Sequence, residues 1–371
     1  MLARTTWRTV SARSPSAMIG GVSDTTQQQD DRAAAPVPDV RVNCRHRSRL
    51  YRRGVLVASD LPLRELADRG ADPDALVWVD LLAPTLSDLT ALAPLVGGEL
   101  ELHPLAVENA VSGSQRPRLV RYRDHSLLHA RAVHLDPADG TLASTRVAAF
   151  ILDRALITIR SDDGFPLEPL LAQWDDIGGL TERGVGFLVH SLLDQLVDGY
   201  FEVLDDLDDR IQDLEDELLE GTGPTRDIQL RSFSLRKDVV RLSRVVLPMN
   251  EALSALLRPG AHALYADIVP YYQDVYDHAL RATERIDGLR DTIESILSTS
   301  LAMQGNSLNE IMKKLTAWAA IIAIPTGVTG YFGQNIPFPG YGESWGFWLS
   351  AVMLVGLAAG LWFGFRRRGW L

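Results

Sequence analysis

The sequence predicts an α+β cytosolic domain, a mixed sheet with helices, followed by long helices and two C-terminal transmembrane helices. Between residues 40 and 163 short apolar runs alternate with turn signals, which is typical of strands mixed with helices. From residue 164 onward the apolar residues follow a helical period. Two uncharged apolar runs, 315–332 and 345–365, lie near the end, and each is long enough to cross a hydrocarbon core of about 30 Å.

Residues 1–40 are expected to be a disordered N-terminal extension. This segment contains arginines, serines, the run Gln27–Gln29 and an alanine- and proline-rich stretch at 33–38. Such a composition supplies too little apolar surface to bury a core.

The cytosolic α/β domain is expected over 41–180. Strands are predicted from apolar runs, which lie at 77–81, 126–135, 147–152 and 155–159. The turn residues at 136–140 predict a hairpin between the second run and the third. Helices are predicted at 85–95 and 104–111, the latter with Pro104 at an early helical position.

Long helices follow this domain. An antiparallel helical pair is expected over 181–260, with amphipathic stretches at 185–220 and 225–257 separated by Gly221-Thr222-Gly223-Pro224. A stalk helix is expected over 261–332, because no strong breaker interrupts it before Pro325, and it continues into the first transmembrane helix. The remaining assignments are an extracytoplasmic loop at 333–344, a second transmembrane helix at 345–365 and a basic cytoplasmic tail at 366–371.

Basic residues mark one side of both predicted spans. Lys313 and Lys314 precede the first span, and Arg366, Arg367 and Arg368 follow the second. Because lysine and arginine flank the cytoplasmic ends of spans, both termini are expected in the cytoplasm. The sequence thus predicts a multi-pass protein of the cell (inner or plasma) membrane.

Composition and missing motifs exclude several classes of protein. The net charge of −11 argues against nucleic-acid binding, which needs a basic footprint, and suits a protein that attracts cations. The single cysteine, Cys44, leaves no intramolecular disulfide and no multi-cysteine zinc site. The sequence offers no Gly-x4-Gly-Lys-Ser/Thr loop and no set of nucleophile, base and orienting residue, so an enzyme is not expected, nor is a cofactor.

An acidic run covers the first of the long helices. Within the run only Arg210 opposes the acids, which are Asp194, Asp198, Glu202, Asp205, Asp206, Asp208, Asp209, Asp213, Glu215, Asp216, Glu217 and Glu220. One interpretation is a solvated helix face, and the other is a reservoir of cations.

One face of the first predicted span is polar, small or sulfur-containing. Steps of about 3.6 residues collect its members, Asn309, Met312, Leu315, Thr316, Ala319, Ala323, Thr326 and Gly330. This face is either a helix-packing stripe or, with several copies around an axis, the lining of a water-filled pore. In a pore, Asn309, Thr326 and Asn335 would present oxygens, while Met312 and Leu315 would form apolar gates. Neutral oxygens suit a divalent ion that keeps its water, magnesium above all.

Several motifs resemble the CorA family of divalent metal ion (magnesium/cobalt) transporters. The C-terminal motifs are 309–316, the span interrupted by Pro325, Tyr331-Phe332-Gly333-Gln334-Asn335 and the terminal Arg-Arg-Arg-Gly-Trp-Leu. Upstream motifs similar to the same family are His103-Pro104-Leu105, Gln115-Arg116-Pro117, Val197-Asp198-Gly199-Tyr200-Phe201 and 271–278. The resemblance extends from about residue 75 to the end.

The resemblance implies a funnel-shaped homopentamer whose stalk helix lines the pore. It also implies a Gly-Met-Asn signature at the outer mouth, which here reads Gly333, Gln334 and Asn335. Gly333 and Asn335 match this signature, so the resemblance implies the same turn and the same ion-facing amide. Gln334 stands in the position of the methionine. The related zinc-transporting branch, the ZntB-like proteins, also departs from methionine at this position.

The resemblance further implies a cytosolic inhibitory metal site that pairs acids across subunits. Asp274 matches one of these acids, and Asp277 lies in the same motif. The position aligned with the partner acid is Asn109, although Glu108 precedes it and would partly replace it. In the outer loop, Glu343 is the only charged residue and would attract cations to the mouth.

The expected function is a divalent metal cation channel or transporter, above all for magnesium uptake down the electrochemical gradient through a pentameric pore. One alternative is a ZntB-like zinc or broad-specificity transporter, with or without proton coupling. An alternative of another class is a membrane-anchored cytosolic scaffold or sensor. The expected partners are further copies of the chain, the lipid bilayer and divalent ions, which serve as substrate and regulator.

Overall fold

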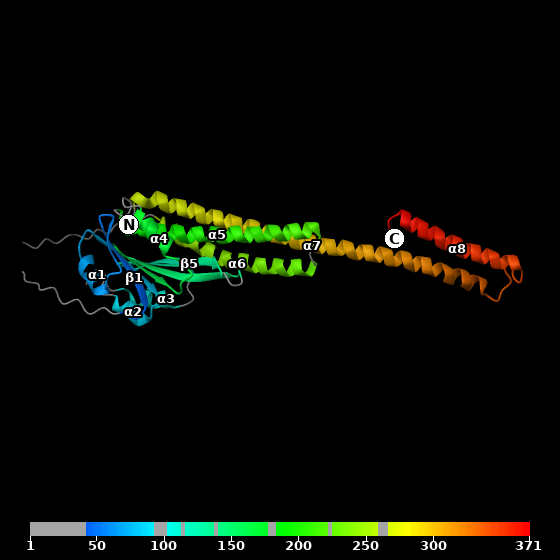
Figure 1. Ribbon diagram of the computed structural model, residues 1–371, viewed down its shortest axis with the longest axis horizontal. Coiled ribbons are helices and arrows are strands. Elements are labelled where there is room, and N and C mark those ends of the chain that lie inside the picture. The colour runs from blue at the N-terminus through cyan, green and yellow to red at the C-terminus, as the bar shows by residue number, and fades with distance from the viewer. Residues whose placement is uncertain are drawn as a thin grey trace, which may run out of the picture. The chain divides into compact units, whose positions relative to one another are not determined.

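The computed structural model describes residues 42–92, 102–112, 116–136, 140–176, 183–221, 225–258 and 266–371. Figure 1 shows these parts as coloured ribbons. The predicted disordered extension at 1–40 lies outside the described residues, and so does the centre of the predicted hairpin turn, 137–139.

A seven-stranded mixed sheet forms the centre of the N-terminal domain, in the order β2-β1-β3-β7-β6-β5-β4. Its strands are β1 (Arg45–Arg52), β2 (Val55–Ser59), β3 (Ala75–Leu82), β4 (Arg118–Arg121), β5 (Ser126–Leu135), β6 (Leu142–Ile151) and β7 (Ala155–Arg160). β3 and β7 are parallel, and all other neighbouring strands in the sheet are antiparallel. The prediction of a mixed sheet is therefore confirmed, although β6 begins earlier than the predicted strand.

Helices cover both faces of the sheet. On one face the side chains of α1 (Leu63–Gly70), α2 (Leu86–Ala91) and α3 (Pro104–Val111) share a core with the sheet. α3 begins where expected, because Pro104 occupies its first turn and the His103 ring accepts a hydrogen bond from the Leu105 N–H at 3.2 Å. The other face packs against α4 (Glu168–Asp176) and against the long helices.

Three long helices follow: α5 (Val185–Glu220), α6 (Thr225–Leu256) and α7 (Val269–Phe332), the last preceded by a short 3-10 helix at Ala266–Ile268. Gly184 before α5 has φ of +80°, and α5 ends at Gly221 in the left-handed conformation that glycine favours. Buried apolar residues on α5 recur every three or four positions, among them Val203, Leu207, Ile211, Leu214 and Leu218. The three helices and the sheet therefore share one core.

Arginines from two other helices pair with the acidic run on α5. Arg285 of α7 lies 2.7 Å from Asp205 and 3.4 Å from Asp208, and Arg231 of α6 pairs with Glu217. Arg210 pairs with Asp206 within α5 at 2.6 Å. The run is thus partly paired across the bundle, and the opposing charges that the local sequence lacks come from residues far along the chain.

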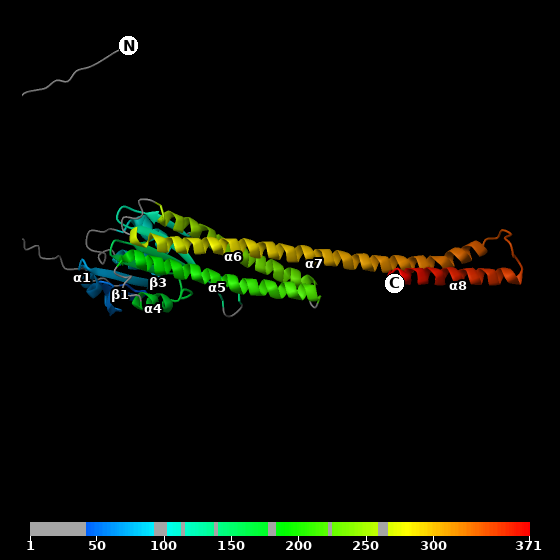
Figure 2. The same ribbon diagram turned by 90° about the horizontal axis from the view of Figure 1, so that it is seen from above.

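α7 leads from the bundle to the second apolar helix, α8 (Ser344–Arg367). In both views α7 extends beyond the ends of α5 and α6, and α8 turns back along its last part (Figures 1 and 2). Among the described residues, α7 and α8 are the two helices long and apolar enough to cross a membrane. Their most apolar stretches are only 11% and 6% buried within the chain.

The buried His129 on β5 predicts that the fold is sensitive to acid. The residue is 5% exposed, and burial, assisted by Arg118 on the neighbouring strand, lowers the pKa of His129 from 6.5 to about 4. The unfolded chain would take up this proton near pH 6.5 and the folded chain only near pH 4. Stability should therefore fall as the pH drops through this window, by roughly 1 kcal/mol at about pH 5.5. Thermal unfolding of the purified protein at about pH 7.5 and about pH 5.5 measures this loss, which should be smaller in His129→Gln. An equal loss in both proteins would contradict the prediction.

Candidate pore face and metal site

The predicted pore-lining face of α7 is exposed in the single chain. All of its members are exposed, namely Asn309, Met312, Leu315, Thr316, Ala319, Ala323, Thr326 and Gly330. Burial on this part of α7, where α8 packs, falls instead on Ala317 and in part on Ile321, Ile324 and Val328. At about 100° per residue the two sets lie on opposite sides of the helix. The second span therefore leaves the predicted face free to meet other copies of the chain or lipid.

Glycines close the loop between the two spans. The Gly333 N–H donates to the Thr329 carbonyl at 2.8 Å, where α7 ends. A Cβ on Gly333 would lie 2.8 Å from that same oxygen, so a larger residue would displace the backbone. Gly340 has φ of +91°, which favours glycine. The turn leaves the side chains of Gln334 and Asn335 exposed.

Glu343 lies at the other end of this loop. It directly precedes α8 and is exposed. Phe338 fills the loop between the two ends, with its ring 5.1 Å from that of Phe332 and 5.3 Å from that of Tyr341. Rings in such edge-to-face contact hold the loop against the end of α7.

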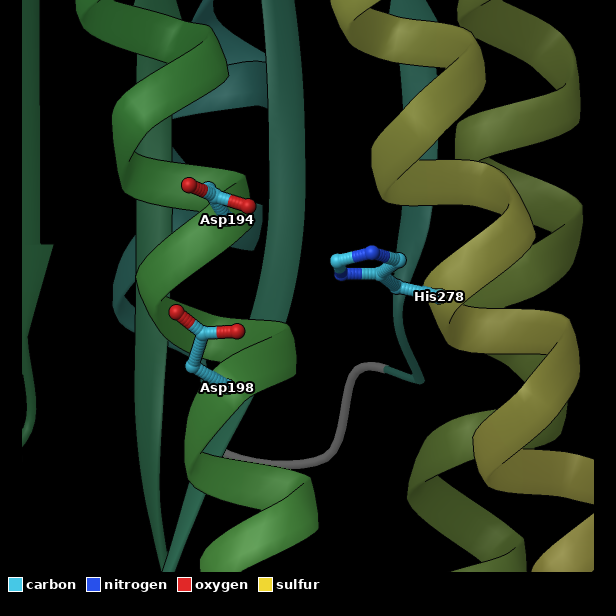
Figure 3. Close-up of side chains that lie close together, drawn as sticks. All are labelled: Asp194, Asp198 and His278. Atoms are coloured by element: carbon cyan, nitrogen blue, oxygen red, sulfur yellow. The ribbon is translucent and has the colours of Figure 1, made fainter.

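A group of metal-ligating side chains lies between α5 and α7, below called the carboxylate cluster: Asp194, Asp198 and His278. The two aspartates are one turn apart on α5, and His278 faces them from α7 (Figure 3). One ligand atom from each residue lies within 4.8 Å of the others. A fourth residue, Asp274, lies one turn before His278 with its carboxylate 3.7 Å from the imidazole Nε2.

Burial raises the pKa of both aspartates in the cluster. For Asp194 burial has the largest effect, His278 opposes it and Asp274 adds to it. For Asp198 burial again has the largest effect and is followed by the charge of Asp194. Burial and mutual repulsion thus disfavour the ionised form of both carboxylates. A cation placed between them would stabilise that ionised form.

The donors of the cluster suit a divalent metal ion. Carboxylate oxygens bind magnesium, which normally keeps several waters in its shell. The imidazole nitrogen adds affinity for zinc, cobalt and nickel, which accept nitrogen ligands. The geometry therefore supports a site of mixed oxygen and nitrogen donors, open to water because Asp198 is exposed.

The residues predicted for the regulatory site lie in different places. Asp274 adjoins the carboxylate cluster, whereas Asp277 is exposed outside it. Glu108 is exposed on α3, which packs on the opposite face of the sheet from the bundle. Within one chain Glu108 and Asp274 are therefore not brought together, and an ion shared by them would lie between two copies.

Two of the cluster residues belonged to the predicted acidic run, but the cluster itself was not predicted. The sequence offered one signal: Asp194 and Asp198 have the i,i+4 spacing of neighbours on one helix face. His278 lies 80 positions beyond Asp198, and only the packing of α7 against α5 brings it there.

The chain combines a sheet domain, a helical bundle that continues into two membrane-length helices, and a group of side chains that could hold a metal ion. This combination is compatible with a membrane transporter of divalent cations. A family model described as "CorA-like Mg2+ transporter protein" matches residues 73–367, and the chain belongs to this family. The predicted family, fold class and function as a divalent cation transporter are thus confirmed. Membership of a family of metal ion transporters argues against the alternative of a membrane-anchored scaffold or sensor.

Some relatives are named as magnesium transporters and others as zinc transporters. The chain is 27% identical over 317 residues to the "Cobalt/magnesium transport protein CorA" of Thermotoga maritima, covering 85% of this chain and 87% of that protein. It is 30% identical over 275 residues to the "Zinc transport protein ZntB" of Pectobacterium carotovorum, covering 73% and 82%.

Solved structures share the fold. The complete structure of the CorA magnesium transporter from Methanocaldococcus jannaschii superposes with a TM-score of 0.66 at 25% identity, covering 81% of this chain and 93% of that one. The full-length CmaX protein, at 21% identity, shows the same fold with a TM-score of 0.62 over 87% of this chain and 97% of that one.

Proposed function

We propose that the chain forms a homopentameric channel through which Mg²⁺ enters the cytosol down its electrochemical gradient. The observation that carries this proposal is the face of α7 that α8 leaves uncovered, with Asn309 and Thr326 among its exposed members. A helix that served only as an anchor would gain nothing from the Thr326 hydroxyl at membrane depth, where unpaired polar groups are costly, or from the Asn309 amide on the same face just before the span. Five such faces around an axis would line a water-filled path.

In this pore each level has its own task. Gly333, Gln334 and Asn335 would form the outer selectivity ring, and Glu343 would raise the local concentration of cations. Met312 and Leu315 would act as apolar gates that close by dewetting. The membrane potential favours entry of a divalent ion by about 4.6 kcal/mol per 100 mV, so no nucleotide hydrolysis is required.

The same arrangement gives the orientation in the cell (inner or plasma) membrane. Lys313 and Lys314 on α7 and the arginines at the end of α8 lie at the same end of the two spans. This end would face the cytoplasm, together with the sheet domain and both termini. The carboxylate cluster would then sense cytosolic metal, with Asp274 beside it, while Asp277 and Glu108 would contribute only between copies.

A zinc or broad-specificity transporter is the second candidate. Gln334 in place of methionine and the imidazole of the carboxylate cluster favour it. Proton coupling through an acid within the membrane is not supported, because 315–332 and 345–365 contain no Asp or Glu.

Ion flux into proteoliposomes tests the proposal. With an inside-negative potential, the purified protein should take up Mg²⁺ faster than Zn²⁺, Co²⁺ or Ni²⁺. Faster Zn²⁺ uptake with Mg²⁺ ignored would establish the second candidate, and uptake of no divalent ion would refute transport. The detergent-corrected mass should equal that of five 40.9 kDa chains, and a monomer or dimer would refute the pore geometry.

A further inference from the structure

A cavity lies between the sheet and α6, apart from the pore face and the carboxylate cluster. It has a volume of about 620 Å³ and lies between α6 and residues on or beside strands β4, β5 and β6. Sites for small molecules typically have volumes of about 300 to 1,000 Å³. The cavity is therefore large enough for a small ligand.

Four arginines line this cavity: Arg116 just before β4, Arg131 on β5, and Arg241 and Arg244 on α6. Among the described lining residues Glu251 is the only acid. Arg241 lies 3.3 Å from Asp238, and Arg131 donates to the Ser144 hydroxyl at 3.3 Å. Within the described part of the chain, no carboxylate lies within ion-pair distance of Arg116 or Arg244.

This concentration of positive charge contrasts with the rest of the protein. The chain carries a net charge of −11, and Arg285 on α7, for comparison, pairs with both Asp205 and Asp208. Guanidinium groups that line one cavity repel one another, and an anion with several charges relieves this repulsion. Arginine also offers paired N–H donors that match the oxygens of a phosphate.

The other walls of the cavity complete a binding site of this kind. Ser144 and Ser243 supply hydroxyl donors, while Val133 and Val245 are buried apolar residues. Leu247 is 48% exposed at the edge of the cavity, where an apolar part of a ligand would cover it. A lining that combines charged donors with apolar side chains suits a phosphorylated compound better than a simple ion.

We propose that this cavity binds a small polyphosphate anion, either free or carried by a nucleoside. Arg116 and Arg244 would hold the phosphate oxygens, joined by Arg131 and Arg241. The apolar residues at the edge would contact the nucleoside, where one is present. This site is independent of the pore and of the carboxylate cluster.

Calorimetric titration of the full-length protein in nanodiscs tests the proposal. ATP, tripolyphosphate and adenosine are the probes, each in EDTA so that magnesium cannot bridge the phosphates. ATP and tripolyphosphate should bind, with affinity that falls as salt rises, and adenosine should not. Tighter binding of ATP than of tripolyphosphate identifies a nucleotide site, and the reverse identifies a site for free polyphosphate.

Substitutions locate the binding. The double variant Arg116→Ala/Arg244→Ala should bind the probes at least about tenfold more weakly, because two charged hydrogen-bond donors are lost. Arg226→Ala is the control for loss of an arginine outside the cavity, since Arg226 is exposed on α6 and does not line the cavity. The fall in affinity with salt, measured on the native protein, tests the role of charge in binding without any variant.

Three results would overturn the proposal. One is that neither phosphate probe binds at millimolar concentration, as would follow if an acidic segment of another copy filled the cavity. The second is binding that the double variant leaves unchanged while it elutes as the native protein does. The third is adenosine binding as tightly as ATP.

Discussion

Replacing Asn335 with alanine is expected to lower Mg²⁺ flux into proteoliposomes by more than about tenfold. The residue follows the turn at Gly333, and its side chain is exposed beyond the end of α7. In the proposed pentamer five such amides would surround the outer mouth. Their oxygens would accept hydrogen bonds from the water around an incoming ion, so alanine would remove every one of these contacts at once.

Asn335→Asp tests whether the neutral amide matters or only the size of the side chain, because aspartate has nearly the same shape but carries a negative charge. A ring of carboxylates would bind the ion more tightly and slow its release, since conduction needs binding weak enough for the ion to leave. Flux should therefore fall in this variant too, while the apparent affinity for Mg²⁺ rises. In the alanine variant the affinity should fall together with the flux.

Glu343→Gln is the matched control in the same loop. It removes the loop's only charge, which acts at a distance, and the loss should be modest and should disappear at high salt. If the Asn335→Ala variant eluted as the native oligomer does and still carried Mg²⁺ at the native rate, Asn335 would not be part of the selectivity ring.

The long helices could be predicted closely because their pattern is local. The predicted stretch at 185–220 has the bounds of α5, and Phe332 ends both the predicted stalk and α7. Glycine and proline on either side of these stretches act on the backbone wherever the rest of the chain lies. α3 likewise begins at the proline that predicted it.

β1 could not be predicted from its own residues. Its sequence, Arg-His-Arg-Ser-Arg-Leu-Tyr-Arg, is too charged to indicate a strand. In the structure Arg45, Arg47 and Arg49 pair with acids more than a hundred residues away, namely Asp163, Glu168 and Asp175. Pairing with β2 and β3 and the burial of Leu50 and Tyr51 stabilise the strand, and its arginines find their acidic partners only in the folded chain.

The same limit applies to the candidate sites. The pore face was predicted because all its members lie on one helix, where spacing alone decides which side chains share a side. The carboxylate cluster needs two helices, and the arginine-lined cavity needs a helix and several strands. Sites built from separate elements depend on packing, which periodicity does not reveal.

Removing both acids of the carboxylate cluster is expected to release the transporter from inhibition by cytosolic metal. In Asp194→Asn/Asp198→Asn the amides keep the size of the side chains but lose both charges. The Mg²⁺ concentration that halves flux from the cytosolic side should rise at least about tenfold, since two ionic ligands are lost. Flux at zero cytosolic metal should stay near the native value, because neither residue lies on the pore face.

The acidic run supplies a matched control for this change. Asp209 and Asp213 are exposed on the same helix with the same i,i+4 spacing. Asp209→Asn/Asp213→Asn removes the same charge from α5 but leaves the cluster intact. If this control raised the inhibitory concentration as much as the cluster variant does, the effect would come from the general charge of the helix and not from a bound ion.

His278→Gln then tests which metal ion the cluster binds in preference. Loss of the imidazole nitrogen should weaken inhibition by Zn²⁺ or Co²⁺ more than inhibition by Mg²⁺, because magnesium gains little from a nitrogen ligand. If only Mg²⁺ inhibition changed, His278 would act by holding Asp274, 3.7 Å from its Nε2, and would not be a ligand. Since an ion in the proposed pore would meet neutral oxygens and an ion at the cluster would meet carboxylates and an imidazole, the two sites are expected to differ in the metal that each prefers.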